Sequence, residues 1–372
     1  MKLTKKSKTN KSTSTVAPTS WYKAFAQPGI LAGTCLNDSS SNLLLIDAST
    51  GKTIAQHTVP ATMHEPTLGS VNFSLCDGPN SDDGASNLYI RQQFSPDFSK
   101  LTFTSAPQSD GSVHVGYLDI ATNKFTDLTA QSITMGFSAN IPIDVNPIFD
   151  PKNGMLCFVR TSATPGLVGS DPANGSNEIH CNNLSTHADV IEGGVINSPS
   201  NDVNNYFLTI QNGIFVTGDH LVSPDSNLFT VTAPTVLGRV LFAPTIAGIA
   251  SFMWDASKPL PNGTYFDVPF NTLSADVFAW LNNSNLLMSF RGSSGIYMIP
   301  PSSSHELDAT PLDIIPTNNA ANTNVIVSPS GTNLAFIHTL LSVSDLFITP
   351  TAAGSTPTKL LHNFSARLIE WQ

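Results

Sequence analysis

The residues best suited to chemistry in this chain are its histidines, carboxylates and cysteines, and their spacing matches few catalytic patterns. The nine histidines lie at positions 57, 64, 114, 180, 187, 220, 305, 338 and 362. None belongs to a His-x-x-x-His or His-Glu-x-x-His motif and no Cys-x-x-Cys occurs, so a zinc site has no local support. Alternation along strands places most of these histidines on strand or loop surfaces, which predicts solvated side chains.

Other local signatures of catalysis are also missing from the sequence. There is no Gly-x-Ser-x-Gly motif of the serine hydrolases, no phosphate-binding loop and no dinucleotide fingerprint. Each of these is a local pattern that a sequence can show. Residues that converge from distant parts of the chain are not excluded by this search.

The most acidic loop covers residues 76–84 and contains Asp77, Asp82 and Asp83. Calcium prefers several hard oxygen ligands from one loop, which makes these three the candidate metal ligands. Their spacing differs from the EF-hand pattern and Pro79 interrupts it, so a surface turn rich in Asp and Asn is the favoured interpretation. The alternative interpretation is a Ca²⁺ site, and no other cofactor is predicted.

The four cysteines can be interpreted in two ways. They can be buried thiols that act as small hydrophobic side chains. Alternatively, an even count in a chain rich in Ser and Asn favours disulfides, although an N-terminal signal segment is missing. Cys157 and Cys181 fall in adjacent predicted strands and are the preferred pair, ahead of Cys35 with Cys76.

A turn phrase recurs along the chain and predicts the elements that carry these residues. The phrase is an apolar or aromatic residue, a tight polar turn and then an alternating apolar strand, and its clear copies cover residues 94–103, 149–158 and 327–336. Weaker copies lie at 197–200, 242–245 and 280–283. Prolines 96, 151, 199, 244 and 329 are separated by 55, 48, 45 and then 85 residues. A period in the forties is typical of a four-stranded propeller blade.

The last copy can be divided into strands at 324–327, 334–339, 345–349 and 358–362, all rich in β-branched and aromatic residues. No window shows an apolar stripe at helical spacing over three turns, so we predict an all-β chain. The phrase, best seen in Phe94-Ser95-Pro96-Asp97 and in residues 327–331, resembles the repeat of TolB-type β-propellers, a WD-repeat-like family. This resemblance implies a β-propeller over roughly residues 25–372.

Counting turn phrases predicts a seven-bladed β-propeller of four-stranded blades. The expected spans are 28–60, 85–130, 140–194, 195–232, 236–273, 276–317 and 323–364. The first span starts in its second strand, at residue 30, and residues 366–372 form a leftover apolar strand. We therefore expect the C-terminal strand to complete the first blade and close the ring, which removes exposed sheet edges.

Charge is distributed unevenly between a basic tail and an acidic body. Charged residues make up only 12% of the chain, and the net charge is −10. Residues 1–20 contain Lys2, Lys5, Lys6, Lys8 and Lys11 and no acid, which leaves −15 for residues 21–372. We predict two parts: a disordered, solvated tail at 1–20 and a propeller at 21–372. The alternative for the tail is a tether to an anionic partner.

Composition also bears on location and partners. The acidic body argues against nucleic-acid binding by the propeller. No run of 18 apolar residues predicts a transmembrane segment, and the tail lacks the apolar stretch of a signal peptide. The low charge favours an extracellular, periplasmic or virion surface, with the route of export left open.

Two functions from different classes fit these observations. The first is a non-enzymatic binding or structural assembly module that contacts another protein, or copies of itself, through its loop faces. The second is a channel-mouth enzyme of the propeller lyase or glycosidase type, which requires converging carboxylates, histidines or a cofactor. Scarce charged residues favour the first function, because catalysis usually draws on positioned ionisable groups.

Overall fold

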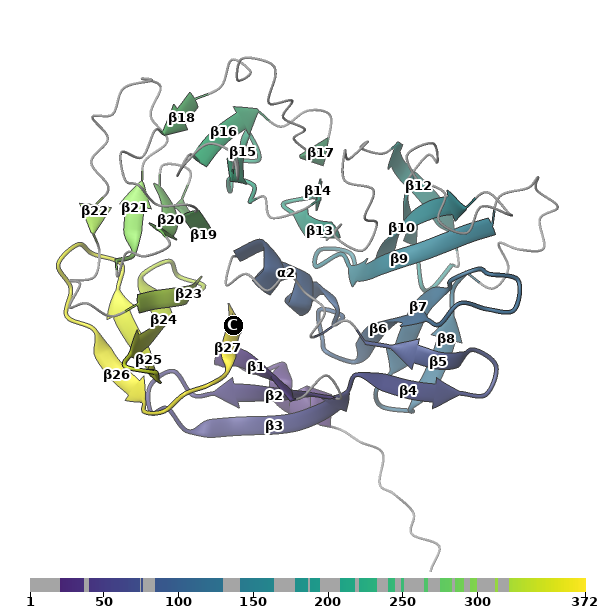
Figure 1. Cartoon of the computed structure of the whole chain (residues 1–372), viewed down its shortest axis with the longest axis horizontal. Coiled ribbons are helices and arrows are strands. Elements are labelled where there is room, and N and C mark those ends of the chain that lie inside the picture. The colour runs from purple at the N-terminus through teal and green to yellow at the C-terminus, as the bar shows by residue number, and fades with distance from the viewer. Residues whose placement is uncertain are drawn as a thin grey trace, which may run out of the picture.

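The structure of this chain is a computed structural model that shows a ring of β-sheets around a short central helix (Figure 1). It describes residues 21–36, 40–73, 75, 84–129, 141–163, 178–186, 188–194, 208–217, 221–232, 240–244, 249–250, 264–266, 275–282, 285–290, 295–299, 312–313 and 321–372. The fold is all-β and propeller-like, and the described residues include two helices, α1 (Trp21–Phe25) and α2 (Gly84–Gln92). Among the described residues, no helix is long and apolar enough to cross a membrane.

Five of the sheets have four or five strands. The first has the order β27-β1-β2-β3, and the other four follow the chain order of their strands. The strands of the first sheet are β1 (Ile30–Leu36), β2 (Ser40–Ile46), β3 (Thr53–Pro60) and β27 (Arg367–Trp371). The strands of the second sheet are β4 (Thr62–Glu65), β5 (Gly69–Asn72), β6 (Lys100–Ser105), β7 (Val115–Asp119) and β8 (Lys124–Asp127).

The remaining three of these five sheets lie further along the chain. The third sheet of the chain has β9 (Ile141–Phe149), β10 (Leu156–Ala163), β11 (Glu178–Asn182) and β12 (Asp189–Gly194). The next of the three has β19 (Ala275–Asn282), β20 (Asn285–Phe290), β21 (Tyr297–Ile299) and β22 (Leu312–Asp313). The last has β23 (Ala321–Val327), β24 (Asn333–Leu340), β25 (Val343–Pro350) and β26 (Thr358–Leu361). The last sheet matches the four strands predicted from the sequence.

Two sheets of three strands lie between β12 and β19. They are β13 (Leu208–Gln211), β14 (Ile214–Thr217) and β17 (Ile249–Ala250), and β15 (Leu228–Thr232), β16 (Val240–Pro244) and β18 (Thr264–Phe266). The predicted boundary between the fourth and fifth blades, at residues 232–236, is wrong because β15 pairs with β16 rather than with β14.

One copy of the turn phrase was missed in this region and another was misplaced. Residues 222–229 read Val-Ser-Pro-Asp-Ser-Asn-Leu-Phe and lead into β15. The Ser223 hydroxyl donates to Asp225 at 2.6 Å, as the Ser95 hydroxyl does to Asp97 at 2.7 Å in the clearest copy. The weak copy at 242–245 is not a turn where the structure describes it, because residues 242–244 belong to β16. The weak copy at 197–200 lies outside the described residues.

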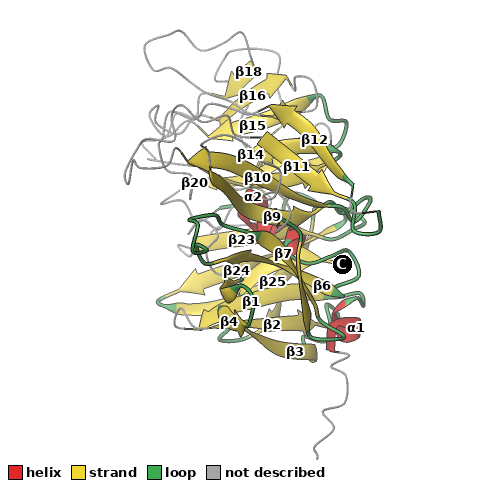
Figure 2. Ribbon diagram, turned by 90° about the vertical axis from the view of Figure 1, so that its right-hand side faces the viewer, coloured by secondary structure: helices red, strands yellow, loops and turns green. Residues whose placement is uncertain are grey.

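The sheets bury both faces against their neighbours, which explains the apolar runs in their strands. In β1 the side chains of Ile30 and Ala32 pack in the cluster shared with the last sheet, whereas Leu31 packs in the cluster shared with the second sheet. Successive residues of a strand point to opposite faces, so a strand buried on both sides needs an unbroken apolar run. The side view of the molecule shows that strands make up most of the described chain (Figure 2).

The C-terminal strand joins the first sheet, as the sequence predicted. β27 pairs antiparallel with β1, with Ile30 opposite Trp371 and Ala32 opposite Leu368, and a register shift between Leu31 and Ala32. Gly29 and Gln372 extend the pairing with two backbone hydrogen bonds of 3.2 and 2.9 Å. The N-terminal and C-terminal parts of the chain are therefore bound to each other within one sheet.

We predict that Leu368→Ala lowers the free energy of unfolding by about 2–5 kcal/mol, because it leaves a cavity at a fully buried position in the closing strand. Leu341→Ala is the matched control, since Leu341 is 90% exposed, and it should change stability by less than about 0.5 kcal/mol. Denaturant unfolding measures both. Equal effects of the two substitutions would contradict the closing role of β27.

Candidate functional site

Helix α2 lies in the channel at the centre of the ring (Figure 1). The sequence predicted these residues as the start of the blade at 85–130. The helix contacts β27, β13, β19, β23 and β9, which belong to five different sheets. The expectation of strands alone is therefore wrong here. The helix escaped detection because it is buried on nearly all sides, with seven of its nine residues buried, and so shows no apolar stripe.

The first residue of α2 allows the helix to touch the strand β19. A Cβ atom on Gly84 would lie 1.8 Å from the carbonyl oxygen of Phe278, far inside any permitted contact. Glycine is the residue that lets backbone approach backbone this closely. The acidic loop therefore ends at a glycine that positions the helix in the channel.

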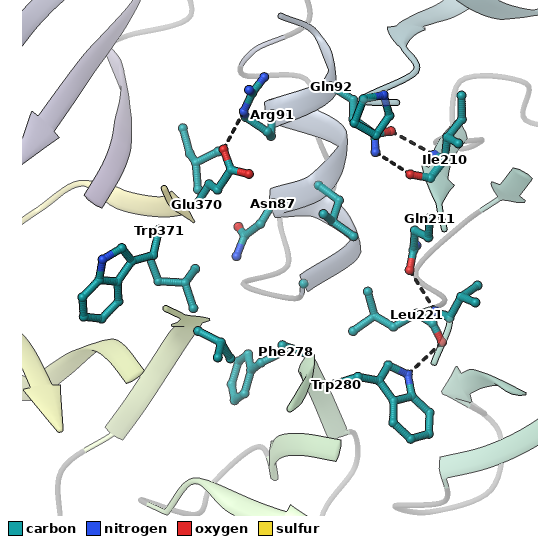
Figure 3. Close-up of a pocket in the computed structure, with 18 of the residues that line it drawn as sticks. Asn87, Arg91, Gln92, Ile210, Gln211, Leu221, Phe278, Trp280, Glu370 and Trp371 are labelled. Carbon is teal, nitrogen blue, oxygen red and sulfur yellow. Dashed lines mark hydrogen bonds and ion pairs between the residues drawn. The ribbon is translucent and has the colours of Figure 1, made fainter. Parts of the chain in front are cut away.

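Side-chain carboxamides connect the channel to the inner edges of the sheets. Gln92 donates its amide to the Ile210 carbonyl at 2.7 Å and accepts from the Ile210 N–H at 2.9 Å, so it pairs with β13 as a neighbouring strand would (Figure 3). Asn324 makes the same two-way pairing with the backbone of Leu368. Unpaired backbone groups inside a protein are costly, and these amides satisfy four of them.

Asn324 is aimed at β27 by an irregularity of its own strand. The register of β23 against β24 shifts between Thr323 and Ile326, and Asn324 has a positive φ of 50°. A bulge of this kind redirects a side chain, and asparagine tolerates the left-handed backbone better than most residues. The amide of Asn324 also lies 3.4 Å from Oδ1 of Asn87 on α2.

Arg91 and Glu370 form the ion pair of the channel. Nε of Arg91 donates to Oε2 of Glu370 at 2.5 Å, which ties α2 to β27. The remaining guanidinium nitrogens lie 3.2–3.4 Å from the carbonyls of residues 94, 95 and 96, and the group covers the Phe98 ring at 4.2 Å. Arg91 thus holds the turn after the helix as well as the closing strand.

A pocket of about 550 Å³ lies beside α2. Its walls come from α2, the inner strands and the turns that follow them, as the close-up shows (Figure 3). The lining residues that retain exposure are mostly apolar, and three prolines of turn phrases stand at its rim. The apolar ones are Leu88, Pro96, Pro151, Pro224, Ala279, Trp280, Val327 and Trp371, and the polar ones are Arg91, Asn212 and Glu370. The pocket therefore offers an apolar, aromatic surface with few charged groups.

Of the candidate site residues named from the sequence, the structure describes only Cys157 and Cys181, and neither lines this pocket. Asp77, Asp82 and Asp83, the calcium candidates, and the tail lysines Lys2, Lys5, Lys6, Lys8 and Lys11 lie outside the described residues. Within the described part of the chain, no group of three or more His, Cys, Asp or Glu side chains is arranged to hold a metal ion. The pocket residues Asn87, Arg91, Gln92 and Glu370 were missed because they meet only through the fold.

The preferred cysteine pair lies in the third sheet. Cys157 stands directly opposite Cys181 in the β10–β11 ladder, both are buried, and their sulfurs form a disulfide with an S–S distance of 2.05 Å. Cys76 lies outside the described residues, so the second candidate pair is not placed. The disulfide links two neighbouring strands and lies away from the pocket lining.

Two of the histidines differ from the solvated side chains that were predicted. His114 and His180 are buried, at 8% and 4% exposure, because each pairs with carboxylates on its own sheet. Nδ1 of His114 lies 2.7 Å from Asp127, and this hydrogen bond raises the pKa of the histidine. His180 lies 3.0 Å from Asp189 and 3.3 Å from Glu178. These pairs stabilise the sheets and do not line the pocket.

Comparison with known proteins yields structural similarity only. No family model matches the chain, and no curated protein matches its sequence. TolB from Acinetobacter baumannii is 14% identical, with 92% of this chain and 67% of TolB covered and a TM-score of 0.37. Prolyl oligopeptidase B from Galerina marginata, bound to a 25mer macrocyclization substrate, is 13% identical over 91% of this chain and 45% of its own, with a TM-score of 0.41.

A putative 6-phosphogluconolactonase from Bacteroides fragilis is 11% identical, with 93% of this chain and 97% of that chain covered and a TM-score of 0.39. The chain thus spans about two thirds of TolB and less than half of the oligopeptidase. Similarity at this level does not assign the chain to a family and carries no conclusion about its activity.

We predict that Gly84→Ala destabilises the protein, because the new methyl group overlaps the Phe278 carbonyl and forces α2 away from β19. The melting temperature should fall by several degrees, as for an overpacked core position. Gly154→Ala is the control for the methyl group itself: its Cβ meets nothing within 4 Å, although its positive φ adds some strain. If Gly84→Ala is the milder of the two, the contact between helix and strand does not constrain the channel.

Proposed function

We propose that this chain is a non-enzymatic binding module whose binding site is the pocket beside α2. The observation that carries the proposal concerns the two charged side chains among the described residues of the pocket: Arg91 and Glu370 are hydrogen-bonded to each other at 2.5 Å. The walls around them are apolar and aromatic. An apolar concave surface with a few oriented polar groups is the usual form of a ligand-binding pocket.

The alternative, a channel-mouth lyase or glycosidase, has less support in this geometry. Glycoside hydrolysis generally needs two carboxyl groups about 5–9.5 Å apart. Among the described residues that line the pocket, Glu370 supplies the only carboxylate, and it is bonded to Arg91. An acid or base role for Glu370 would require it to leave this partner.

The partner that we propose is another protein, or a second copy of this chain, bound on the face of the ring where the turn phrases lie. Pro96, Pro151 and Pro224 come from three such turns and border the same pocket. The basic tail at 1–20 remains a proposed tether to an anionic partner, on the basis of its five lysines.

We also propose that the ring has seven blades and that its repeat is of the TolB type. The two three-stranded sheets support this count, because each occupies one step of the chain between complete blades and the second follows its own turn phrase at 222–227. An experimental structure should show seven blades closed by β27. Six or eight blades in that structure would refute the count.

The binding proposal predicts a position-dependent cross-link. A photoreactive benzoylphenylalanine in place of Leu88, inside the pocket, should form an adduct with a partner in the producing cells. The same residue in place of Ile54, which is exposed on β3 of the outer edge, should not. Mass spectrometry of the adducts identifies the partner.

Two results of this experiment would oppose the proposal. An adduct from position 54 with none from position 88 would place the binding surface elsewhere. Conversion of the captured partner into a product of different mass on incubation with the native chain would favour the enzyme. In that case Glu370→Gln should abolish the conversion.

A further inference from the structure

The tip of the β24–β25 hairpin exposes three large apolar side chains to solvent. Leu340 and Val343 face each other at the ends of the two strands, and Leu341 and Ser342 form the turn between them. Leu341 is 90% exposed, Leu340 44% and Val343 41%. Single exposed apolar residues are common on protein surfaces, but a group of three at one turn is typical of a contact surface.

The backbone of this turn is strained at Leu341. Leu341 and Ser342 have positive φ angles of 49° and 69°. A two-residue hairpin turn requires positive φ at both positions, and Asn-Gly supplies it with the least strain. The sequence places a leucine there instead, and the hydroxyl groups of Thr339 and Ser344, 2.8 Å apart, join the strands below the tip. Strain of this kind concentrates at positions that make functional contacts.

The tip and the pocket beside α2 lie at opposite ends of the same sheet. The inner strand β23 contributes residues 325–327, at its C-terminal end, to the pocket. At the other end of β23, Ala321 pairs with Thr339, which directly precedes the tip. The tip therefore points away from the pocket of its own chain, and a second copy can occupy the pocket while the tip stays free.

The chemistry of the tip matches that of the pocket. Residues 339–344 contain no charged side chain, and the charged residues of the pocket, Arg91 and Glu370, are bonded to each other. Residues 21–372 carry a net charge of −15, so two copies repel each other over much of their surface. An uncharged tip and a neutral apolar pocket can meet without burying an unpaired charge. Trp280 and Trp371 offer aromatic surface to the aliphatic side chains of the tip.

We infer that the β24–β25 tip of one copy of this chain inserts into the pocket beside α2 of a second copy, with Leu341 as the anchor. This inference rests on the proposed binding function of the pocket and names the partner as the chain itself. An apolar tip that fits a pocket elsewhere on the same molecule makes a head-to-tail contact, which builds rings or open chains of subunits rather than a dimer of like faces.

The first test measures self-association of the full chain by analytical ultracentrifugation over a range of concentrations. The average mass of the native chain should rise with concentration. Leu341→Asp brings a charge into the apolar contact and should weaken association at least about tenfold. Ile54→Asp is the matched control, because it adds the same charge at an exposed apolar position of β3, and it should associate like the native chain.

A mixing experiment tests the head-to-tail geometry. Leu341→Asp keeps an intact pocket, whereas Ala279→Trp fills the pocket and keeps an intact tip. Each variant alone should stay monomeric, and a mixture of the two should form one-to-one dimers that grow no further. If Ala279→Trp melts at a lower temperature than the native chain, Leu88→Asp replaces it, because it blocks the pocket with a charge instead of a ring.

The outcomes separate the inference from the proposed function. A native chain that stays monomeric, while position 88 cross-links a different protein, would overturn the inference and leave the pocket as a binding site. Association of Ala279→Trp alone, with none in the mixture, would assign the tip to a contact between like faces and overturn the insertion. Binding to phosphatidylcholine vesicles that Leu341→Asp abolishes, without self-association, would assign the tip to a membrane instead.

Discussion

The constraint on which this structure depends is the need to pair the inner edges of its sheets. A ring of sheets removes the outer ends of an open array, but each sheet still presents the backbone of its innermost strand to the channel. In this chain α2 enters that channel and contacts strands of five sheets. Gln92 pairs with the backbone of Ile210 as a strand would, and Asn324 does the same for Leu368. The pairing of Gln92 with β13 fixes α2 in the channel. Because Arg91 is on the same helix and the pocket lies beside it, their positions are fixed as well.

Ring closure by β27 serves the same constraint. β27 is both the inner strand of the first sheet and the strand to which Asn324, Arg91 and Asn87 are joined, the last through Arg367. The two ends of the chain and the central helix are thus held at one place. Loss of the closing strand would leave β1 as an unpaired sheet edge and would remove the buried Leu368 and the partner of Arg91 together, which couples stability to the geometry of the pocket.

Much of the fold could be predicted because its signals are local. The turn phrase has short-range hydrogen bonds, such as Ser95 to Asp97 and the Lys100 N–H to Ser95, and these leave a readable pattern in the sequence. The last sheet was predicted strand by strand, and the partnership of 366–372 with β1 followed from an apolar strand without a partner. The Ser-Pro-Asp turn at 223–225 carried the same signal and was overlooked in favour of weaker copies.

The helix and the site could not be predicted in this way. The buried positions of α2 include the polar residues Ser86, Asn87 and Gln92, so no apolar stripe marks its buried sides. The role of Gly84 becomes visible only when Phe278 is placed against it. Asn87, Arg91 and Glu370 are more than 270 positions apart along the chain at their widest, and only the closed ring brings them together. The basic tail and the acidic loop, apart from Gly84, lie outside the described residues.

The hydrogen bonds of the channel side chains are the basis of the proposed binding function. The polar side chains that a catalytic site would need are already bound to other groups of the channel. The carboxylate of Glu370 is bound by Arg91, and the amides of Gln92 and Asn324 are bound to backbone groups. Natural sequences tend to break their own packing rules at functional positions. Nδ2 of Asn87 lacks a hydrogen-bond partner among the described residues, but its accessible surface is below 1 Å², so a molecule in the pocket cannot reach it without a rearrangement.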